Sequence, residues 1–395
     1  MVAPESLVST QVAASLDQAS WIRRMFEKGN ELRAKLGPRN VFDLSLGNPV
    51  IEPPAAFFNT LAELSRKRTG GHHRYMSNAG LLELRAKVAA NLTRRKILPC
   101  QPEDVVMTVG AGGALNVLMK AILNPGDEVV IMAPYFVEYL FYIRNHGGKP
   151  VIANLDKQFD LDLKAIRKAL SRRTKAVIVC SPGNPTGVAL SKSRIAGLHR
   201  LLMAHGRRYG TRVLLVSDEP YREIYYGRGH TPSCTAGYRD SAVVYSWSKS
   251  LSIPGDRIGY LALNKTIGEP TLRSAITFTN RTLGFVNAPA TMQYVAMKLL
   301  DLPAPVAPYR KLRDLLVKGL RDLGIECPTP NGAFYAFPKV PKKFRDDIAF
   351  VEAAQQVGVL VVPGRGFGSP GHFRISYAVE PWVLKGALKA LKQIV

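Results

Sequence analysis

The sequence predicts an α/β protein, in which a large domain has a mostly parallel seven-stranded sheet between helices and a smaller domain is α+β. Between residues 100 and 260, apolar segments of strand length alternate with segments of helical periodicity. Several of the apolar segments are rich in Val and Ile with few polar interruptions, which is typical of strands buried on both faces. From residue 300 onward, the pattern changes to two long amphipathic segments and two short apolar ones. We therefore expect a second domain there.

Seven segments of the first region are strand candidates. In chain order they read DVVMTVG, DEVVIMAP, KPVIANL, KAVIVCSP, RVLLVSDEP, SAVVYSWS and IGYLAL. Helical patterns such as GALNVLMKAIL and KSRIAGLHRLLMAHGRRYG lie between them. Because ligands of open parallel sheets bind at the carboxyl ends of the strands, the polar residues that follow these segments are the candidates for function.

The smaller domain is expected to combine both ends of the chain. VAPYRKLRDLLVKGLRDLG and DDIAFVEAAQQVGV have helical periodicity, and GAFYAFPKV and GHFRISYAV are typical of strands. Near the N-terminus, an amphipathic helical pattern spans 20–37, and VFDLSLGNPV follows it as a short strand that enters a turn. We predict a large domain at 48–290 and a small domain formed by 1–47 together with 291–395.

The composition is that of an ordinary globular enzyme, with 46% hydrophobic and 21% charged residues in a chain of 395. No apolar run reaches the roughly 18 residues of a membrane span. The first residues lack the basic start and apolar centre of a signal peptide, so we expect a cytoplasmic protein with no membrane partner. The four cysteines are far apart and form no CxxC pair, which predicts free thiols without a disulfide framework or a metal site.

The charge is unusually basic, because 54 Lys and Arg residues against 30 Asp and Glu residues give a net charge of +24. The densest basic segments are 65–75, 171–175 and 206–212. They are separate in the sequence, none is a long basic tail, and no zinc-finger spacing or aromatic RNA-binding signature accompanies them. The sequence therefore favours a generally cationic surface and no nucleic-acid partner.

Two motifs that follow the first two strand candidates could contact a ligand. TVGAGGALNVLMKAIL is a strand, a glycine-rich turn and a helix, and the free N–H groups around Ala111, Gly112 and Gly113 could bind a phosphate. A plain tight turn explains the same glycines. In APYFVEY, the ring of Phe136 could stack on a flat ligand or could belong to the core.

Two further strand ends carry an amide and a carboxylate. Asn184 lies in CSPGNPTG, a loop fixed by Pro and Gly, where its side chain could donate to a ligand oxygen or simply form a turn. Asp218 follows the strand of VLLVSDEPYREI, and Tyr221 comes three residues later. The Asp218 carboxylate could pair with a cation in a semi-buried cleft, or it could cap a helix.

The segment SWSKSLSIPGDR places one lysine between serines. A nucleophilic lysine needs a lowered pKa, which burial of Lys249 or the charge of Arg257 could provide. The hydroxyls of Ser246 and Ser248 could bind a phosphate, whereas a solvated loop lysine is the simple alternative. In HFRISYA, Arg374 lies on a strand of the second domain and could grip a carboxylate or form a structural salt bridge.

The order and spacing of these motifs are far more specific than any one of them. SPGNPTG, SDEPY, SWSKSLSIPGDRIGY, NGAFYAF and the pair PGRGFG and GHFRISYA resemble the class I/II aminotransferases, the pyridoxal-phosphate enzymes of fold type I. The resemblance covers nearly the whole chain, from VFDLSLGNP to RISYA. It implies a pyridoxal 5′-phosphate cofactor and exchange of an amino group between an L-amino acid and a 2-oxo acid in a ping-pong cycle. A β-lyase or oxidase that uses the same cofactor is the alternative.

The resemblance also implies roles for individual residues around the cofactor. Lys249 would form the internal aldimine and then move the substrate α-proton. Asp218 would pair with the pyridine nitrogen, and Phe136 would stack on the ring. Asn184 and Tyr221 would hydrogen-bond the phenolic oxygen. The implied phosphate ligands are Ala111, Gly112, Gly113, Ser246, Ser248 and Arg257.

For the substrate, the resemblance implies that Arg374 grips the α-carboxylate, with Gly47 and Asn184 in the same pocket. Because Arg257 and Arg374 would each face an anion, we expect both side chains to be buried.

The resemblance further implies a homodimer with shared active sites. A tyrosine in RYMSNAGLLELR, here Tyr75, would reach the phosphate bound by the neighbouring subunit. One aspartate-specific branch carries a lysine in the glycine-rich turn, where this chain has Gly112. Another branch uses an arginine of the neighbouring subunit, for which Arg281, shortly before LGFVNAPA, is a candidate that lies slightly out of register. The substrate side chain therefore stays open.

Overall fold

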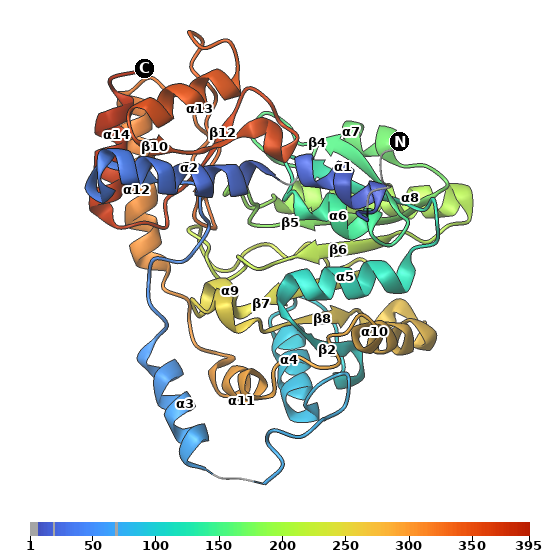
Figure 1. Ribbon diagram of the computed structural model, residues 1–395. Helices are drawn as coiled ribbons and strands as arrows, with labels where there is room; N and C mark the ends of the chain where they lie inside the picture. Colours follow the sequence, from blue (N-terminus) through green and yellow to red (C-terminus); the bar gives the residue numbers. More distant parts are fainter. Residues whose placement is uncertain (1–6, 19, 68–69) are drawn as a thin grey trace, which may run out of the picture.

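The computed structural model describes residues 7–18, 20–67 and 70–395, and its centre is the predicted seven-stranded sheet (Figure 1). The strands are β2 (Val105–Thr108), β3 (Glu128–Ala133), β4 (Lys149–Asn154), β5 (Thr174–Cys180), β6 (Leu214–Asp218), β7 (Ser241–Ser246) and β8 (Gly259–Leu263). They lie in the order β2-β8-β7-β6-β5-β3-β4. β8 runs antiparallel to both of its neighbours, β2 and β7, and the other neighbouring strands pair in parallel, which confirms a mostly parallel sheet made of the seven predicted segments.

Helices cover both faces of this sheet. The helices of this part are α3 (Ala55–Arg66), α4 (Leu82–Arg94), α5 (Gly110–Ile122), α6 (Glu138–Arg144), α7 (Leu163–Ala169), α8 (Lys192–Tyr209), α9 (Trp247–Ser250), α10 (Pro270–Thr282) and α11 (Ala290–Leu299). Val129 and Ile131 point to one face and pack in a core with α5, α6 and α10. Val130 and Met132 point to the other face and pack with α7 and α8. Alternate residues of one strand thus enter two cores, which explains the uninterrupted Val and Ile runs.

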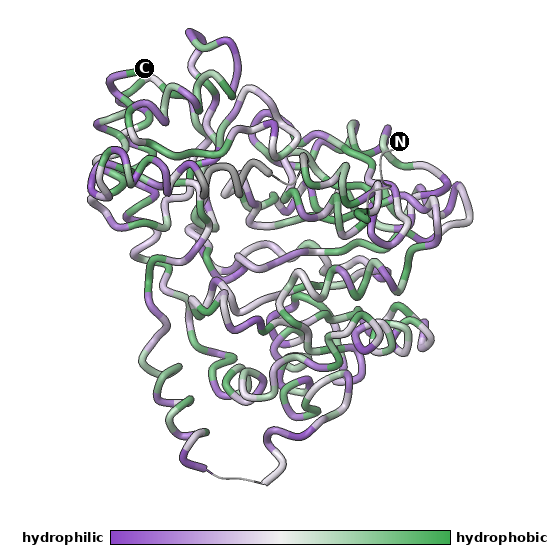
Figure 2. Tube along the Cα trace, in the orientation of Figure 1, coloured by the Kyte–Doolittle hydropathy of each residue, from purple (hydrophilic) through white to green (hydrophobic). Residues whose placement is uncertain are grey.

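A third core lies where β2, β8 and β7 meet α3, α4 and α11. It contains Met107, Val243 and Tyr260 from the strands and Leu84 and Val295 from the helices. Figure 2 shows hydrophobic stretches along the helices and strands and hydrophilic residues at the end of α3. Within the described ranges, no helix has both the length and the apolarity to cross a membrane.

The C-terminal third and the N-terminal segment share a fourth core, in which Leu44 packs among residues of α12 and α14. Phe42 pairs with Val359, so the N-terminal segment joins the C-terminal third through a two-stranded parallel sheet, and β11, β12 and β9 form an antiparallel one. The elements are β1 (Phe42–Asp43), β9 (Tyr335–Ala336), β10 (Val359–Leu360), β11 (Val362–Pro363), β12 (Phe373–Ser376), α1 (Thr10–Gln18), α2 (Ser20–Leu36), α12 (Val306–Asp322), α13 (Asp347–Gln356) and α14 (Pro381–Leu391). The limits of the two domains, 48–290 and 1–47 with 291–395, stay a prediction.

The carboxyl ends of three neighbouring strands meet at one edge of the large sheet. Cys180 at the end of β5 pairs in register with Asp218 at the end of β6, and β7 lies beside β6. Because β8 is antiparallel, its first residue, Gly259, pairs with Ser246 at the end of β7. The loop that carries Arg257 therefore returns to the same edge.

Candidate active site

A pocket of about 300 Å³ opens at this edge of the sheet. The predicted residues that line it are Gly47, Ala111, Gly112, Phe136, Asn184, Asp218, Tyr221, Ser246, Ser248, Lys249, Arg257 and Arg374. Two predicted residues are not in its lining. Gly113 is buried within α5, one residue further into the helix, and Tyr75 is 92% exposed on this chain. The fold therefore brings together most of the residues that the motifs identified, from both ends of the chain.

The start of α5 and Arg257 form one wall of the pocket. Gly110 has φ +68°, and a Cβ atom there would lie 2.9 Å from Nη2 of Arg257, so glycine permits the close approach. Nη1 of Arg257 donates to the carbonyl of Pro254 at 3.0 Å. Our expectation that Arg257 is buried is wrong for the single chain, because the guanidinium lies exposed at the pocket edge. Its charge and the N-terminus of α5 make this wall suited to an anion.

Two serine hydroxyls lie beside that wall. Ser246 is the N-cap of the short helix α9 and accepts from the N–H of Ser248 at 3.2 Å. The two hydroxyl oxygens are 2.6 Å apart and share a hydrogen bond. Both side chains are buried yet line the pocket, so rotation of a hydroxyl suffices to donate to an anion there.

Lys249 belongs to α9 and not to a solvated loop. Its Nζ donates to the carbonyl oxygen of Gly47 at 2.8 Å, which fixes the amine inside the pocket. Burial lowers the pKa of Lys249 to about 8, and the positive charges of Arg374 and Arg257 add to this effect. Because the charged form is disfavoured, a substantial part of the amine is neutral in mildly basic solution. A neutral amine is the nucleophilic form of lysine.

Asp218 is 4% exposed, and only one of its two carboxylate oxygens has a hydrogen-bond partner within the described residues. The hydroxyl of Tyr139 donates to its Oδ2 at 2.5 Å, whereas Oδ1 is buried and has no hydrogen-bond partner within the described part of the chain. Burial raises the pKa of Asp218 to about 7, although the Tyr139 hydrogen bond acts in the opposite direction. The helix-cap alternative is wrong, because a turn follows β6. A buried carboxylate in this state is suited to a cationic donor.

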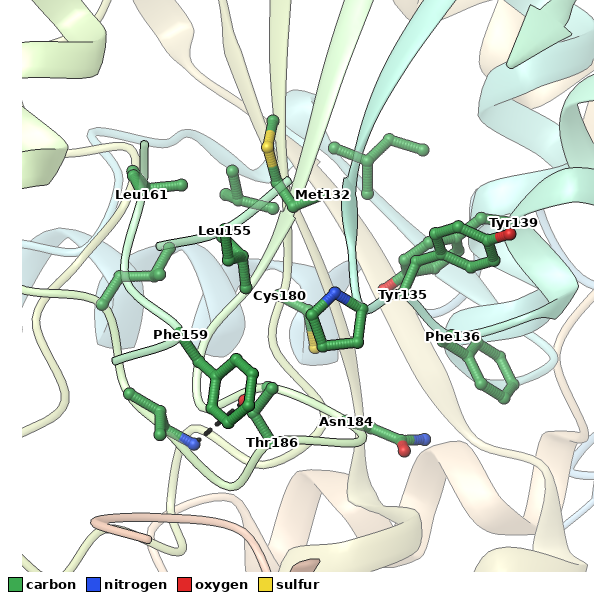
Figure 3. Close-up of a pocket in the computed structure, with 16 residues that line it drawn as sticks. Met132, Tyr135, Phe136, Tyr139, Leu155, Phe159, Leu161, Cys180, Asn184 and Thr186 are labelled. Carbon is green, nitrogen blue, oxygen red and sulfur yellow. Dashed lines mark hydrogen bonds between the residues drawn. The ribbon is translucent and has the colours of Figure 1, made fainter. Parts of the chain in front are cut away.

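Tyr139 was not predicted from the sequence. It lies in APYFVEY three residues after Phe136, and the two rings meet edge to face with centroids 5.6 Å apart. Figure 3 shows Phe136 and Tyr139 on one side of a small adjoining cavity and Asn184 below it. The three-residue spacing of Phe136 and Tyr139 is the one feature of the sequence that could have indicated Tyr139 as a site residue. Only the fold shows that its hydroxyl contacts Asp218.

Arg374 is 2% exposed and has no carboxylate partner among the described residues. Its Nη1 donates to Oδ1 of Asn184 at 3.1 Å and its Nη2 to the carbonyl of Ser45 at 2.5 Å, while Nε has no partner. The guanidinium lies 4.9 Å from the ring centroid of Tyr335 and 4.8 Å from that of Phe367. The structural salt bridge considered from the sequence is therefore not formed within this part of the chain. A buried, unpaired cation at a pocket is suited to an anionic ligand.

Tyr335 connects the two halves of the pocket and was also missed. Its hydroxyl lies 2.9 Å from the hydroxyl of Tyr221, and the two rings meet edge to face. A Cβ atom on Gly47 would lie 1.9 Å from the Tyr335 hydroxyl, so this position must be glycine for the ring to fit. The motif NGAFYAF is part of the family resemblance, but nothing in it indicates which of its aromatic residues enters the pocket.

The sequence matches the family model of aminotransferase class I and II over residues 39–391. This chain belongs to the class I/II aminotransferases. Its sequence is 34% identical over 362 residues to the probable aspartate/prephenate aminotransferase of Thermus aquaticus, covering 89% of this chain and 90% of the relative. The aspartate aminotransferase of Bacillus subtilis is 31% identical over 386 residues, covering 93% of this chain and 94% of the relative.

Solved aminotransferase structures have the same fold. An aminotransferase of Eubacterium rectale superposes with a TM-score of 0.94 at 34% identity, covering 99% of this chain and 98% of the other. The aspartate aminotransferase of Thermus thermophilus with maleate gives 0.87 at 29% identity, covering 99% and 100%. The predicted family, fold class and aminotransferase activity are confirmed, and nothing favours a lyase or an oxidase.

The family implies pyridoxal 5′-phosphate as the cofactor, and the residues present fit it. The free Oδ1 of Asp218 can accept from a protonated ring nitrogen. The start of α5, the paired serine hydroxyls and Arg257 offer donors and positive charge to a phosphate. Lys249 supplies an amine of lowered pKa in the same pocket.

Proposed function

We propose that this aminotransferase holds pyridoxal phosphate covalently at Lys249 and exchanges an amino group between an L-amino acid and a 2-oxo acid. The observation that carries the proposal is the fixed amine of Lys249, bonded to Gly47 at 2.8 Å in a pocket that also holds Asp218 and Arg374. When bound, the cofactor supplies an electron sink that stabilises negative charge at the substrate α-carbon.

Lys249 is the group that moves the substrate α-proton. Its Nζ has a pKa of about 8, so it can accept a proton and return it near neutral pH without a large energetic cost in either direction. Arg374 binds the substrate α-carboxylate and thereby orients the α-carbon toward Nζ. Asn184 holds Arg374 through the 3.1 Å hydrogen bond to Nη1, so it orients the guanidinium as well as contacting the ligand.

Asp218 keeps the cofactor ring nitrogen protonated. An ion pair there would offset the cost of burying the carboxylate, and it would lower the pKa of Asp218 below the value of about 7 that it has in the cofactor-free protein. Tyr139 holds the other carboxylate oxygen and so aims Oδ1 at the ring. Tyr221, Asn184 and Phe136 also line the pocket, where Tyr221 and Asn184 would hydrogen-bond the phenolic oxygen of the cofactor and Phe136 would stack on its ring.

We propose a homodimer, because Tyr75 lies outside the pocket of its own chain and is almost fully exposed. In the dimer, Tyr75 would reach the phosphate that the neighbouring subunit binds. Sedimentation of the enzyme at micromolar concentration tests this, and a monomer that is fully active would contradict it.

We also propose a cytoplasmic location. All four cysteines are free thiols, which fits a reducing compartment, and cell fractionation tests this.

Aspartate is the first amino donor to test, because several relatives are named aspartate or aspartate/prephenate aminotransferases. The glycine-rich turn offers no lysine for a second carboxylate, since Gly112 occupies that position. Arg281 is exposed on α10 with its guanidinium 5.5 Å from the ring of Phe278, and it does not line the pocket of its own chain. A role for Arg281 in substrate binding therefore requires the partner subunit.

The test is a panel of single amino acids, each added to the holoenzyme without an oxo acid. A transaminase converts its cofactor once and stops, and the absorbance then returns when a 2-oxo acid is added; a lyase would turn over continuously. In parallel, Lys249→Ala should lose the protein adduct that borohydride fixes, whereas Lys298→Ala, at a surface amine paired with Glu63, should retain it. An adduct at the parental yield in Lys249→Ala would contradict the assignment.

A further inference from the structure

The basic segments 171–175 and 206–212, separate in the sequence, meet on one face of the protein. Arg172, in the turn before β5, and Arg208, near the end of α8, place their guanidinium carbons 5.4 and 5.2 Å from the ring centroid of Tyr209. The ring of His205 lies 4.8 Å from that of Tyr209, and its Nε2 is 3.1 Å from the carbonyl oxygen of Ser171. These contacts join the two segments into one cationic cluster.

A groove of about 690 Å³ adjoins this cluster, and we refer to it as the arginine groove. Its lining combines four exposed arginines with apolar side chains, of which Met203 is 42% exposed. The arginines are Arg167, Arg200, Arg207 and Arg208, and the apolar residues are Leu163, Leu170, Leu201, Met203 and Ala204. The groove thus offers guanidinium groups next to an apolar surface in a concave site of ligand-binding size.

The charge of the arginine groove is not neutralised locally. The sequence has twelve Lys and Arg residues but no Asp or Glu between positions 163 and 217. Arg194 and Arg212, within this stretch, form ion pairs with acidic residues outside it. Within the part of the chain that the structure describes, the four groove arginines form none, and the nearby Asp162 carboxylate caps α7. A cationic patch of this kind attracts polyanions.

We propose that the arginine groove binds single-stranded nucleic acid. Guanidinium groups form bidentate hydrogen bonds with phosphate oxygens, and the apolar lining can receive bases that are not stacked within a duplex. A concave groove suits a strand better than the flat surface of a bilayer, and membrane-surface binding needs an apolar face that projects outward. The expectation of no nucleic-acid partner rested in part on the separation of the basic segments in the sequence, and the fold brings two of these segments together.

The arginine groove is independent of the aminotransferase site. It shares no lining residue with the pocket that contains Lys249. Figure 1 places α7 and α8 on the opposite side of the molecule from the segment between α3 and α4 that carries Tyr75. A bound strand would therefore leave both the pocket and the proposed dimer contact free.

Fluorescence anisotropy of a labelled thymine strand of about 20 nucleotides, titrated with holoenzyme between roughly 50 and 200 mM salt, tests the proposal. The groove variant carries Arg200→Gln, Arg207→Gln and Arg208→Gln. The control variant removes the same charge from exposed positions of α12, with Lys311→Gln, Lys318→Gln and Arg321→Gln. We expect the groove variant to bind at least about tenfold more weakly, with a salt slope lower by about 2, and the control to change by less than about twofold.

Three results would overturn the proposal. In the first, the control variant loses as much affinity as the groove variant, which would mean diffuse attraction by net charge. In the second, a duplex of the same length binds more tightly than the strand. In the third, the groove substitutions reduce binding to phosphatidylserine vesicles and leave strand binding unchanged. Unaltered transamination shows that both variants fold, and the single variant Arg200→Gln repeats the test with a smaller perturbation.

Discussion

Replacing Tyr335 by Phe would remove one hydroxyl from the active-site pocket and leave the ring in place. The lost contact is the 2.9 Å hydrogen bond with the hydroxyl of Tyr221, and both side chains are buried. A buried hydrogen bond contributes about 1 kcal/mol net, and an unsatisfied partner costs somewhat more. Since Tyr221 is proposed to contact the cofactor, we expect kcat/KM to fall by about 5- to 30-fold, the equivalent of about 1 to 2 kcal/mol.

Tyr335→Leu removes the ring as well as the hydroxyl. Comparing it with Tyr335→Phe separates the role of the hydroxyl, which contacts Tyr221, from the role of the ring, which contacts Arg374. The guanidinium of Arg374 lies 4.9 Å from the ring centroid, and such a desolvated cation–π contact contributes about 0.5 to 2 kcal/mol. Because Arg374 is proposed to bind the substrate α-carboxylate, Tyr335→Leu should raise KM for the amino donor. Tyr335→Phe retains the ring and should act mainly on kcat.

Steady-state kinetics with L-aspartate and a pH titration of the bound cofactor's absorbance measure these effects. Tyr377→Phe is the matched control, because Tyr377 is equally buried and its hydroxyl donates to Tyr226 at 3.2 Å, away from the pocket. The control should lose stability but keep kcat/KM and the titration of the cofactor. Equal kinetic losses in Tyr377→Phe and Tyr335→Phe, or an equal KM in the Phe and Leu variants, would refute the reasoning.

Two further predictions concern Gly47 and the charge of Lys249. Gly47→Ala should destabilise the protein by about 1 to 3 kcal/mol in urea unfolding, because the new Cβ atom would lie 1.9 Å from the Tyr335 hydroxyl. The double variant Gly47→Ala with Tyr335→Phe lacks that hydroxyl, so it should regain part of the lost free energy of unfolding. If it regains none, the destabilisation comes from the backbone at position 47 and not from this contact. In the cofactor-free enzyme, burial lowers the pKa of Lys249 to about 8 from 10.5. The unfolded chain therefore binds more protons above pH 8, so the free energy of unfolding should rise by up to about 3 kcal/mol as the pH increases from about 8 to about 10.5. Lys249→Met should lack this pH-dependent increase in the free energy of unfolding. If Lys249→Met and the parent protein have the same pH dependence, the amine of Lys249 is not desolvated.

Local patterns in the sequence predict the strands of the large sheet and identify several side chains of the site as candidates. The strands of the sheet other than the edge strand β4 are largely buried on both faces, so their apolar runs stand out without any knowledge of their neighbours. Asn184, Asp218 and Lys249 follow such runs, and parallel strands bring their carboxyl ends to one edge. The resemblance of the combined motifs to the class I/II aminotransferases then implied that these residues share a site with Arg374 at the other end of the chain.

Tertiary structure alone decided the partners of those side chains. Tyr139 meets Asp218 across 79 positions and Tyr335 meets Tyr221 across 114, and no periodic pattern links residues so far apart. The same holds for Arg257, whose exposure depends on how the loop after α9 returns to the pocket edge, and for Tyr209, around which two distant basic segments meet. Sequence patterns report the periodicity of one element at a time, whereas hydrogen bonds, burial and charge clusters depend on which elements the fold places side by side.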